Sequence, residues 1–204
     1  MLKILAYVAL VLVVVLVGLL VFAATKPDML RVQRVTSIQA PPEEIFPLIN
    51  DFQHWGAWSP YEKVDPAMKR TYSGAERGEG AVYAWEGNGN VGHGSMTIVE
   101  TSPPDYVIID LAFTKPFEGH NEVKFTLEPQ GETTHVTWDM RGPNTYMSKV
   151  MQIFLNMDTM IGKQFEQGLA DLKRVAESAD NPAAAPATPS SSDVPETSPA
   201  DKPR

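Results

Sequence analysis

The sequence lacks cysteine altogether. Disulfide bonds, thiolate nucleophiles, cysteine-bound zinc and a lipid-modified cysteine are therefore excluded. Basic residues are also few, because 17 Lys and Arg stand against 25 Asp and Glu, and the net charge is -8. Proteins that bind nucleic acids use clustered Lys and Arg to neutralise phosphates, and this chain has no basic run. We therefore expect no nucleic-acid partner.

Residues suited to catalysis or metal binding are also scarce. The imidazoles are His54, His93, His120 and His135. Strand alternation places the last three opposite the apolar residues of their strands, towards water. No Gly-x-Ser-x-Gly motif is present, so the chain has no nucleophile elbow. We predict no catalytic residue, no metal site and no cofactor.

A glycine-rich segment, residues 87–92, reads GNGNVG and matches the Gly-x-Gly-x-x-Gly pattern of dinucleotide sites. That motif requires a helix directly afterwards, whereas another alternating strand follows here. The dipeptide Asn-Gly is a strong signal for a two-residue hairpin turn with positive φ. We therefore predict a hairpin turn at Asn88-Gly89 and no phosphate-binding loop.

Against these absences stands one long apolar run, Ile4 to Ala24, which has 21 residues and neither charge nor proline. At about 1.5 Å per residue, a helix of this length spans the roughly 30 Å hydrocarbon core of a bilayer. A cleavable signal peptide is the alternative, with Val21-Phe22-Ala23 as its cleavage site, but its apolar region is usually shorter. We expect a single-pass membrane anchor.

The sequence around this run gives opposing signals about which side of the membrane the domain occupies. Lys26, Arg31 and Arg34 follow the run, and the positive-inside rule favours the cytoplasm for such a cluster. The segment before the run is minimal, as in export signals, and the chain ends in a tail of extracytoplasmic character. We expect the domain to lie outside the cytoplasmic membrane.

Composition divides the chain into three regions. Residues 1–25 form the anchor and residues 28–178 form one globular domain, which is long enough to bury a sizeable core. Residues 179–204 are rich in Pro, Ala, Ser and Thr. This tail has too few large apolar residues to offset the entropy of ordering, so we predict that it is disordered.

The globular region shows a strand, two short helices, a run of strands and one long helix. The first strand is expected at Leu30 to Ala40, and the short helices at Pro41 to Ile49 and Phe52 to Trp58. Period-2 alternation predicts the later strands at Met68 to Ser73, Ala81 to Gly87, Val91 to Thr101, Tyr106 to Thr114, Gly119 to Glu128 and Thr133 to Gly142. Helical spacing of apolar residues predicts one long amphipathic helix, Met147 to Ser178. We predict an α+β helix-grip fold, in which a curved antiparallel sheet wraps around that helix.

Three stretches carry a resemblance to a known family. They are APPEEIFPLINDFQHWGAWSPYEKVDPAMKRTYSG, GAVYAWEGNGNVGHGSMTIVE and IGKQFEQGLADLKRVAE. Over residues 30–178 the chain resembles the polyketide cyclase/dehydrase and lipid-transport group of the START superfamily, also called SRPBCC. The resemblance implies the helix-grip fold. It leaves the function open among lipid carriers, metabolite binders, cyclases, oxygenase domains and chaperone activators.

The apolar strand faces predict an internal cavity, because a curved sheet closed by one long helix and two short ones leaves a gap. The residues expected to line it are Trp55, Trp58, Tyr83, Trp85, Phe113, Asn121, Trp138, Met147, Phe154 and Met157. Asn121 falls on the apolar face of its strand, where it could orient a ligand or pair with a backbone group. Glu86, at the end of a strand beside Trp85, could also orient a ligand.

Three functions are compatible with this pattern. The first is non-catalytic binding or transfer of an apolar small molecule or lipid by a membrane-tethered domain. The second is a cyclase or dehydratase that uses the same cavity, with titratable groups drawn from Arg70, Tyr72, Tyr83 and Glu86. The third is a protein-interaction module with a solid core. We expect the first.

Overall fold

The computed structural model describes residues 2–154 and 156–179, except for the side chains of residues 2, 147, 154 and 179. The tail expected to be disordered therefore lies outside the described residues, apart from the backbone of residue 179. The helices are α1 (Leu2–Ala24), α2 (Pro42–Asn50), the 3-10 helix η1 (Phe52–Ala57), α3 (Tyr61–Val64), α4 (Tyr146–Phe154) and α5 (Met157–Ala179). The strands are β1 (Met29–Ile38), β2 (Lys69–Gly74), β3 (Ala81–Glu86), β4 (His93–Ser102), β5 (Tyr106–Lys115), β6 (Gly119–Gln130) and β7 (Thr133–Pro143).

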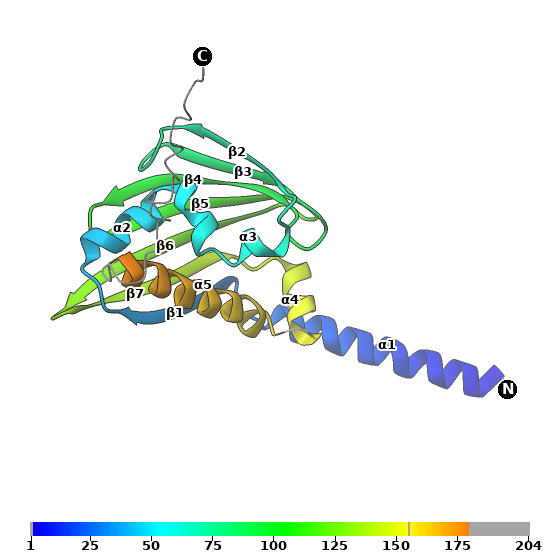
Figure 1. Cartoon of the computed structure of the whole chain (residues 1–204). Coiled ribbons are helices and arrows are strands. Elements are labelled where there is room, and N and C mark those ends of the chain that lie inside the picture. The colour runs from blue at the N-terminus through cyan, green and yellow to red at the C-terminus, as the bar shows by residue number, and fades with distance from the viewer. Residues whose placement is uncertain (1, 155, 180–204) are drawn as a thin grey trace, which may run out of the picture.

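The seven strands form one antiparallel sheet in the order β1-β7-β6-β5-β4-β3-β2. Sequential strands are neighbours except that β1 pairs with β7, so the first strand joins the last, with Val32 opposite Met140. Helix α5 lies against the concave side of this curved sheet, and α2, η1 and α3 flank it (Figure 1). The predicted α+β helix-grip fold is confirmed.

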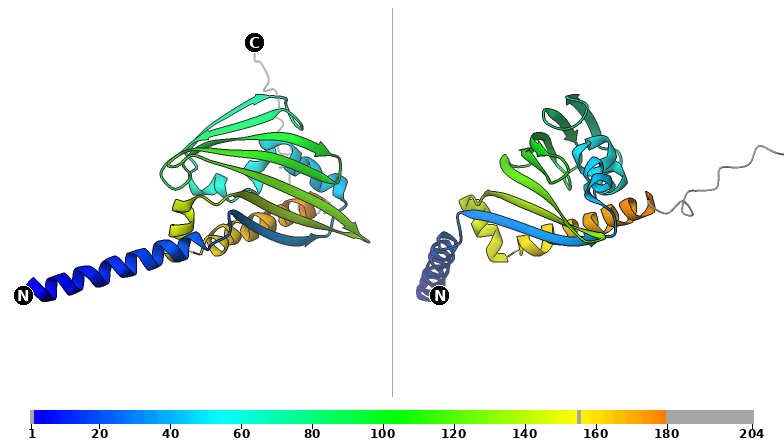
Figure 2. Two further views of the ribbon diagram at one scale, coloured as in Figure 1. Left: turned by 180° about the vertical axis from the view of Figure 1, so that it is seen from behind. Right: turned by 90° about the vertical axis from the view of Figure 1, so that its left-hand side faces the viewer.

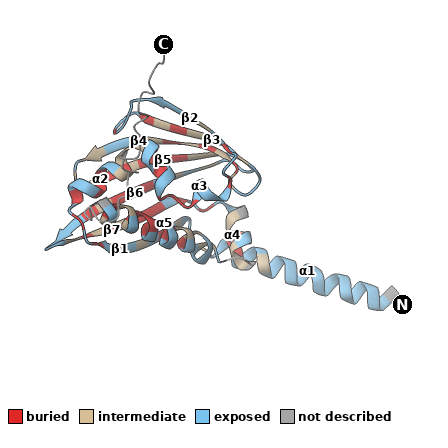
Figure 3. Cartoon of the chain, in the orientation of Figure 1, coloured by how far each residue is buried: buried red, intermediate tan, exposed pale blue. Residues whose placement is uncertain are grey.

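Alternation along the strands separates the core from the solvent-facing side of the sheet. On β6, Val123, Phe125 and Leu127 are buried, whereas His120 on the same strand is exposed. Figure 3 shows the same separation across the sheet, with buried positions recurring along the strands around α5. Period 2 sends every second side chain to one face, so the core is built from one face of each strand.

The prediction of a single helix from Met147 to Ser178 was wrong. The structure has two helices, α4 and α5, and the second begins at Met157. The side chain of Asn156 accepts a hydrogen bond of 3.0 Å from the backbone N–H of Thr159. Asn satisfies an unpaired N–H at a helix start in this way and is among the preferred capping residues. The capping residue is therefore the sequence signal for the break.

Helix α1 projects from one end of the domain and carries a long exposed apolar surface (Figure 2). It is long and apolar enough, over 22 residues from Lys3 to Ala24, to cross a membrane; a signal sequence has the same properties. Its last turns contact α4, where the Tyr146 hydroxyl donates a 2.9 Å hydrogen bond to the carbonyl oxygen of Leu20. Four residues, 25–28, connect α1 to β1.

Candidate functional site

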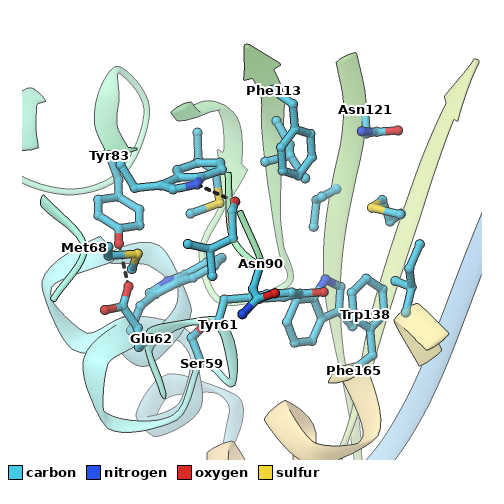
Figure 4. Close-up of a pocket in the computed structure, with 18 of the residues that line it drawn as sticks. Ser59, Tyr61, Glu62, Met68, Tyr83, Asn90, Phe113, Asn121, Trp138 and Phe165 are labelled. Atoms are coloured by element: carbon cyan, nitrogen blue, oxygen red, sulfur yellow. Dashed lines mark hydrogen bonds between the residues drawn. The ribbon is translucent and has the colours of Figure 1, made fainter. Parts of the chain in front are cut away.

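A pocket of about 400 Å³ lies between the concave face of the sheet, the segment from η1 to α3, and helix α5 (Figure 4). Such a volume falls within the roughly 300–1,000 Å³ range of small-molecule sites, which are mostly apolar. The lining residues are Leu30, Trp55, Ser59, Tyr61, Glu62, Met68, Tyr83, Trp85, Asn90, Val91, Met96, Leu111, Phe113, Asn121, Val123, Trp138, Met140, Met157, Ile161 and Phe165. No Lys, Arg or His is among these lining residues of the described chain.

Most of the expected cavity residues lie on this pocket. These are Trp55, Tyr83, Trp85, Phe113, Asn121, Trp138 and Met157. Trp58 instead lies in the core next to the pocket; it is fully buried, and its indole N–H donates a 2.8 Å hydrogen bond to the carbonyl oxygen of Leu48. The side chains of Met147 and Phe154 lie outside the described part of the chain. Whether these residues bind a ligand stays a prediction.

One wall of the pocket is built around Trp85 of β3. Gly94 lies opposite Trp85 on β4, and a Cβ at Gly94 would come within 2.6 Å of the indole. Glycine therefore makes room for the ring to lie flat over the strand. The indole N–H donates a 3.1 Å hydrogen bond to the carbonyl oxygen of Val91, and Phe113 meets the ring edge-on at 5.7 Å. Trp85 is thus held from three sides.

The floor of the pocket is an aromatic stack that joins the sheet to α5. The rings of Trp138 and Phe165 lie 4.1 Å apart at an angle of 9°, and Trp58 meets Trp138 edge-on at 5.7 Å. A Cβ at Gly168 would lie 2.8 Å from Trp138 Cζ3 and 2.9 Å from Pro60 Cδ, so α5 and the short-helix segment approach the indole closely. The Trp138 Nε1–H is buried and has no hydrogen-bond partner among the described residues.

A polar cluster closes the side of the pocket next to α3. The Tyr83 hydroxyl donates to Glu62 Oε1 and Arg70 Nε donates to Glu62 Oε2, each at 2.6 Å. Only 9% of the Glu62 side chain is exposed. Burial, and then the hydrogen bond to Glu62, raises the pKa of Tyr83 well above its usual value, so its hydroxyl remains a donor. Both oxygens of the carboxylate are therefore occupied by partners.

Sequence reasoning missed the segment Ser59-Pro60-Tyr61-Glu62, which brings three polar side chains to an apolar pocket. The available signal was Pro60 with the acidic Glu62 two residues later, a pattern that often opens a short helix. Burial raises the pKa of Tyr61 to about 12, although 38% of its surface is accessible. The raised pKa and the accessible surface are compatible, because the Tyr61 side chain projects into a hollow. There it is surrounded by protein but can still be reached by small molecules.

The connection between β3 and β4 is a hairpin, as predicted, but the two-residue turn was wrong. Residues 87–92 form the loop, and the positive φ occurs at Gly92 instead of at Asn88-Gly89. Gly92 and Gly87 pair through a 2.9 Å backbone hydrogen bond, and Asp65 accepts a 2.8 Å bond from the Asn88 N–H. The loop is thereby fastened to the residues after α3, and it brings Asn90 and Val91 to the pocket.

The remaining polar candidates lie away from the pocket. Glu86 is largely exposed and forms a 3.3 Å ion pair with Lys69. His120 is exposed and His93 and His135 are half-buried, and none of the three lines the pocket. Among the described residues, no group of three or more His, Asp or Glu side chains could hold a metal ion.

Comparison with known proteins identifies the family. Residues 29–177 match the family described as polyketide cyclase / dehydrase and lipid transport. The chain belongs to this family. The resemblance seen in the sequence is confirmed, and the family combines cyclase, dehydrase and lipid-transport members, so membership supports a small-molecule or lipid domain without separating binding from catalysis. No curated protein matches the chain in sequence.

Solved structures of the same fold come from plants and bacteria. Ginseng major latex-like protein 151 from Panax ginseng is 16% identical with a TM-score of 0.54, covering 74% of this chain and 99% of its own. Protein CV1439 from Chromobacterium violaceum is 16% identical with a TM-score of 0.52 and the same coverage. Protein MLL2253 from Mesorhizobium loti is also 16% identical, with a TM-score of 0.52, covering 72% and 97%. At these identities the likeness concerns the fold alone.

Proposed function

We propose that this family member is a membrane-tethered, non-catalytic domain that holds an apolar small molecule or lipid in the pocket between the sheet and α5. The observation that carries the proposal is the 400 Å³ pocket with its mainly apolar wall. Protein interiors normally pack without voids much larger than a water molecule. An apolar hollow of this size therefore favours a binding domain over an interaction module with a solid core.

The tether is supported by the short connection between α1 and the pocket. Leu30 lines the pocket and lies six residues after Ala24, the last residue of α1. Six extended residues reach at most about 20 Å. If α1 spans a bilayer, the pocket end of the domain stays close to the membrane surface, where an apolar ligand partitions.

The orientation proposed for this tether places the domain outside the cytoplasmic membrane. The Pro-, Ala-, Ser- and Thr-rich composition of residues 179–204 supports it. Because the chain has no cysteine, one cysteine introduced in the exposed loop at Gly89 gives a unique label site. A membrane-impermeant thiol reagent added to intact cells should label it; labelling only after lysis would place the domain inside.

The second candidate function is a cyclase or dehydratase acting in the same pocket, which Glu62 favours because a carboxylate on an apolar wall can act as an acid or base. The hydrogen bonds around it argue for binding instead. Arg70 Nε and the Tyr83 hydroxyl each donate to one of the two carboxylate oxygens, so residues of the wall hold this carboxylate in place. We therefore assign Glu62 to the architecture of the wall.

Binding is tested on the full chain in phosphatidylcholine nanodiscs. Fatty-acid, sterol and polyketide-like probes should change tryptophan emission and raise the melting temperature, since Trp55, Trp85 and Trp138 line the pocket. Leu111→Phe, which fills the pocket from β5, should weaken both effects. Ile108→Phe adds similar bulk at a half-buried position of β5 outside the pocket and should not. If no probe changes emission or melting temperature, the binding function is wrong.

A further inference from the structure

Several polar side chains of the pocket have no hydrogen-bond partner within the described chain, and the amides of Asn90 and Asn121 are among them, whereas the other indole and phenol groups on the wall are satisfied. The N–H groups of Trp55 and Trp85 donate to backbone carbonyls, and the Tyr83 hydroxyl donates to Glu62. The side-chain hydroxyls of Ser59 and Tyr61 have no hydrogen-bond partner within the described chain. Trp138 Nε1 is a further donor without a partner there.

Two of these donors, Ser59 and Tyr61, belong to the short-helix segment, whereas Trp138 belongs to β7. Ser59 and Tyr61 flank Pro60. Gly168 on α5 lies against both Pro60 and the Trp138 indole. Cζ3, the indole atom near Gly168, is on the opposite side of the ring system from Nε1, so the N–H points away from this contact with α5. Figure 4 shows Ser59 and Tyr61 approaching the pocket from the short-helix side and Trp138 on the wall near Phe165.

Burying such groups without a partner is unfavourable, because each loses its hydrogen bonds to water. Ser59 is only 2% exposed and Trp138 only 3%. The Trp138 nitrogen is covered by protein, whereas the Tyr61 side chain projects into the hollow (Figure 4). A ligand oxygen placed here would supply the acceptor that the protein itself lacks.

The charge of the pocket decides what kind of oxygen fits. No cationic side chain lines it in the described part of the chain, and its one lining carboxylate, Glu62, is held by Arg70. A ligand carboxylate would leave water for an apolar wall without an opposite charge, and it would also meet the Glu62 carboxylate. A neutral carbonyl, ester or hydroxyl oxygen accepts the same hydrogen bonds without that cost.

We propose that the ligand is a neutral, oxygen-bearing apolar molecule, such as a long-chain ketone, ester or alcohol, whose oxygen accepts hydrogen bonds from the short-helix donors Tyr61 and Ser59. This inference rests on the proposed binding function and narrows its ligand class. It excludes both a plain hydrocarbon and a fatty-acid anion as the preferred ligand.

The test compares four ω-brominated C12 ligands on the full chain in phosphatidylcholine nanodiscs: the alkane, the 2-ketone, the alcohol and the carboxylate. Bromine quenches tryptophan on contact. All four tryptophans lie in the domain and none in α1, so quenching reports ligand in the domain and not in the surrounding bilayer. Half-saturation is expressed as mole fraction in the bilayer, which corrects for partitioning. The ketone and alcohol should reach it at roughly ten-fold lower mole fraction than the alkane or the carboxylate.

Variants separate the hydrogen bonds from the apolar contacts. Tyr61→Phe and Ser59→Ala should each bring ketone binding towards that of the alkane, and the ratio of the two affinities is the readout. Tyr72→Phe removes a phenol hydroxyl outside the pocket and should change neither. Three outcomes would overturn the ligand class while leaving the binding function intact. They are equal binding of alkane and ketone, strongest binding of the carboxylate, and an unchanged preference for the ketone in both variants. Failure of every ligand to quench would overturn both.

Discussion

The Trp138 indole and the Phe165 ring stack nearly parallel, with centroids 4.1 Å apart, and so fix the distance between β7 and α5. Trp58 and Phe125 pack against the same indole, with ring centroids 5.7 Å and 4.9 Å from it. The pocket lies next to this stack, because Trp138 and Phe165 both line it. The same pair of rings thus packs the core and lines the pocket.

Trp138→Ala should therefore cost stability more than binding. Truncating a buried tryptophan removes its apolar contacts and leaves a cavity, which costs on the order of 3–5 kcal/mol of unfolding free energy. Trp85→Ala should cost about 3 kcal/mol and weaken probe binding more strongly, because that indole faces the pocket from β3. Urea unfolding and probe titration measure the two effects. Equal loss of binding in the two variants would contradict the assignment of Trp138 to the floor.

Gly94→Ala should displace Trp85 and shrink the pocket. The added methyl would lie within 2.6 Å of the indole, so the ring or the strand must move, at a cost of about 1–3 kcal/mol. We expect a lower melting temperature and weaker probe binding. Gly89→Ala is the matched control, since a Cβ there meets nothing within 4 Å. If both variants behave alike, the close approach of Trp85 to Gly94 is not what keeps the pocket open.

Replacing His93, His120 and His135 together with Gln should leave fold and ligand occupancy unchanged. None of the three lines the pocket, and Gln keeps a polar side chain of similar reach on the solvated strand face. Circular dichroism and native mass spectrometry would check this. A lost metal ion or lost ligand in the triple variant would revive a histidine-dependent activity.

Acid should weaken the domain through Asp139. Burial tends to raise the pKa of this carboxyl, but hydrogen bonds from Arg31 and Arg141 outweigh it and the pKa is lowered. Its stabilisation is therefore fully present above the unfolded pKa of about 3.9 and is lost as the pH falls through the lower folded value. Asp139→Asn should cost on the order of 1 kcal/mol at pH 7 and less near pH 3. Urea unfolding at both pH values decides; a pH-independent difference would contradict the linkage.

Deleting residues 1–25 should leave a soluble domain that unfolds cooperatively, because the core cluster lies entirely outside α1. The contact between α1 and α4 refines this expectation: without the Tyr146–Leu20 hydrogen bond, α4 should lose amide protection while the strands keep theirs. Hydrogen exchange of the full and shortened chains measures both. Aggregation of a chain beginning at Lys26 would show that α1 supports the domain as well as projecting from it.

Alternation and helical spacing in the sequence identified the sheet, the covering helices and the inward faces that carry Tyr83, Trp85 and Trp138. They could do so because side-chain direction along a strand or helix is a local property with a fixed period. The apolar run of α1 was equally plain. Local pattern also suggested the helix after β7, but the capping asparagine at 156 divides that helix in two.

Tertiary structure alone decided which inward residues pack solidly and which surround a hollow. Trp55 and Trp58 are three residues apart on the same short segment, yet one lines the pocket and the other is enclosed by aromatic rings. The pairing of Glu62 with Arg70 and Tyr83, and the unpartnered donors of Ser59, Tyr61 and Trp138, were likewise invisible in the sequence. Period gives the direction in which a side chain points, whereas a void depends on the distance between opposing surfaces. That distance is set by side chains far apart along the chain, such as Trp138 and Phe165.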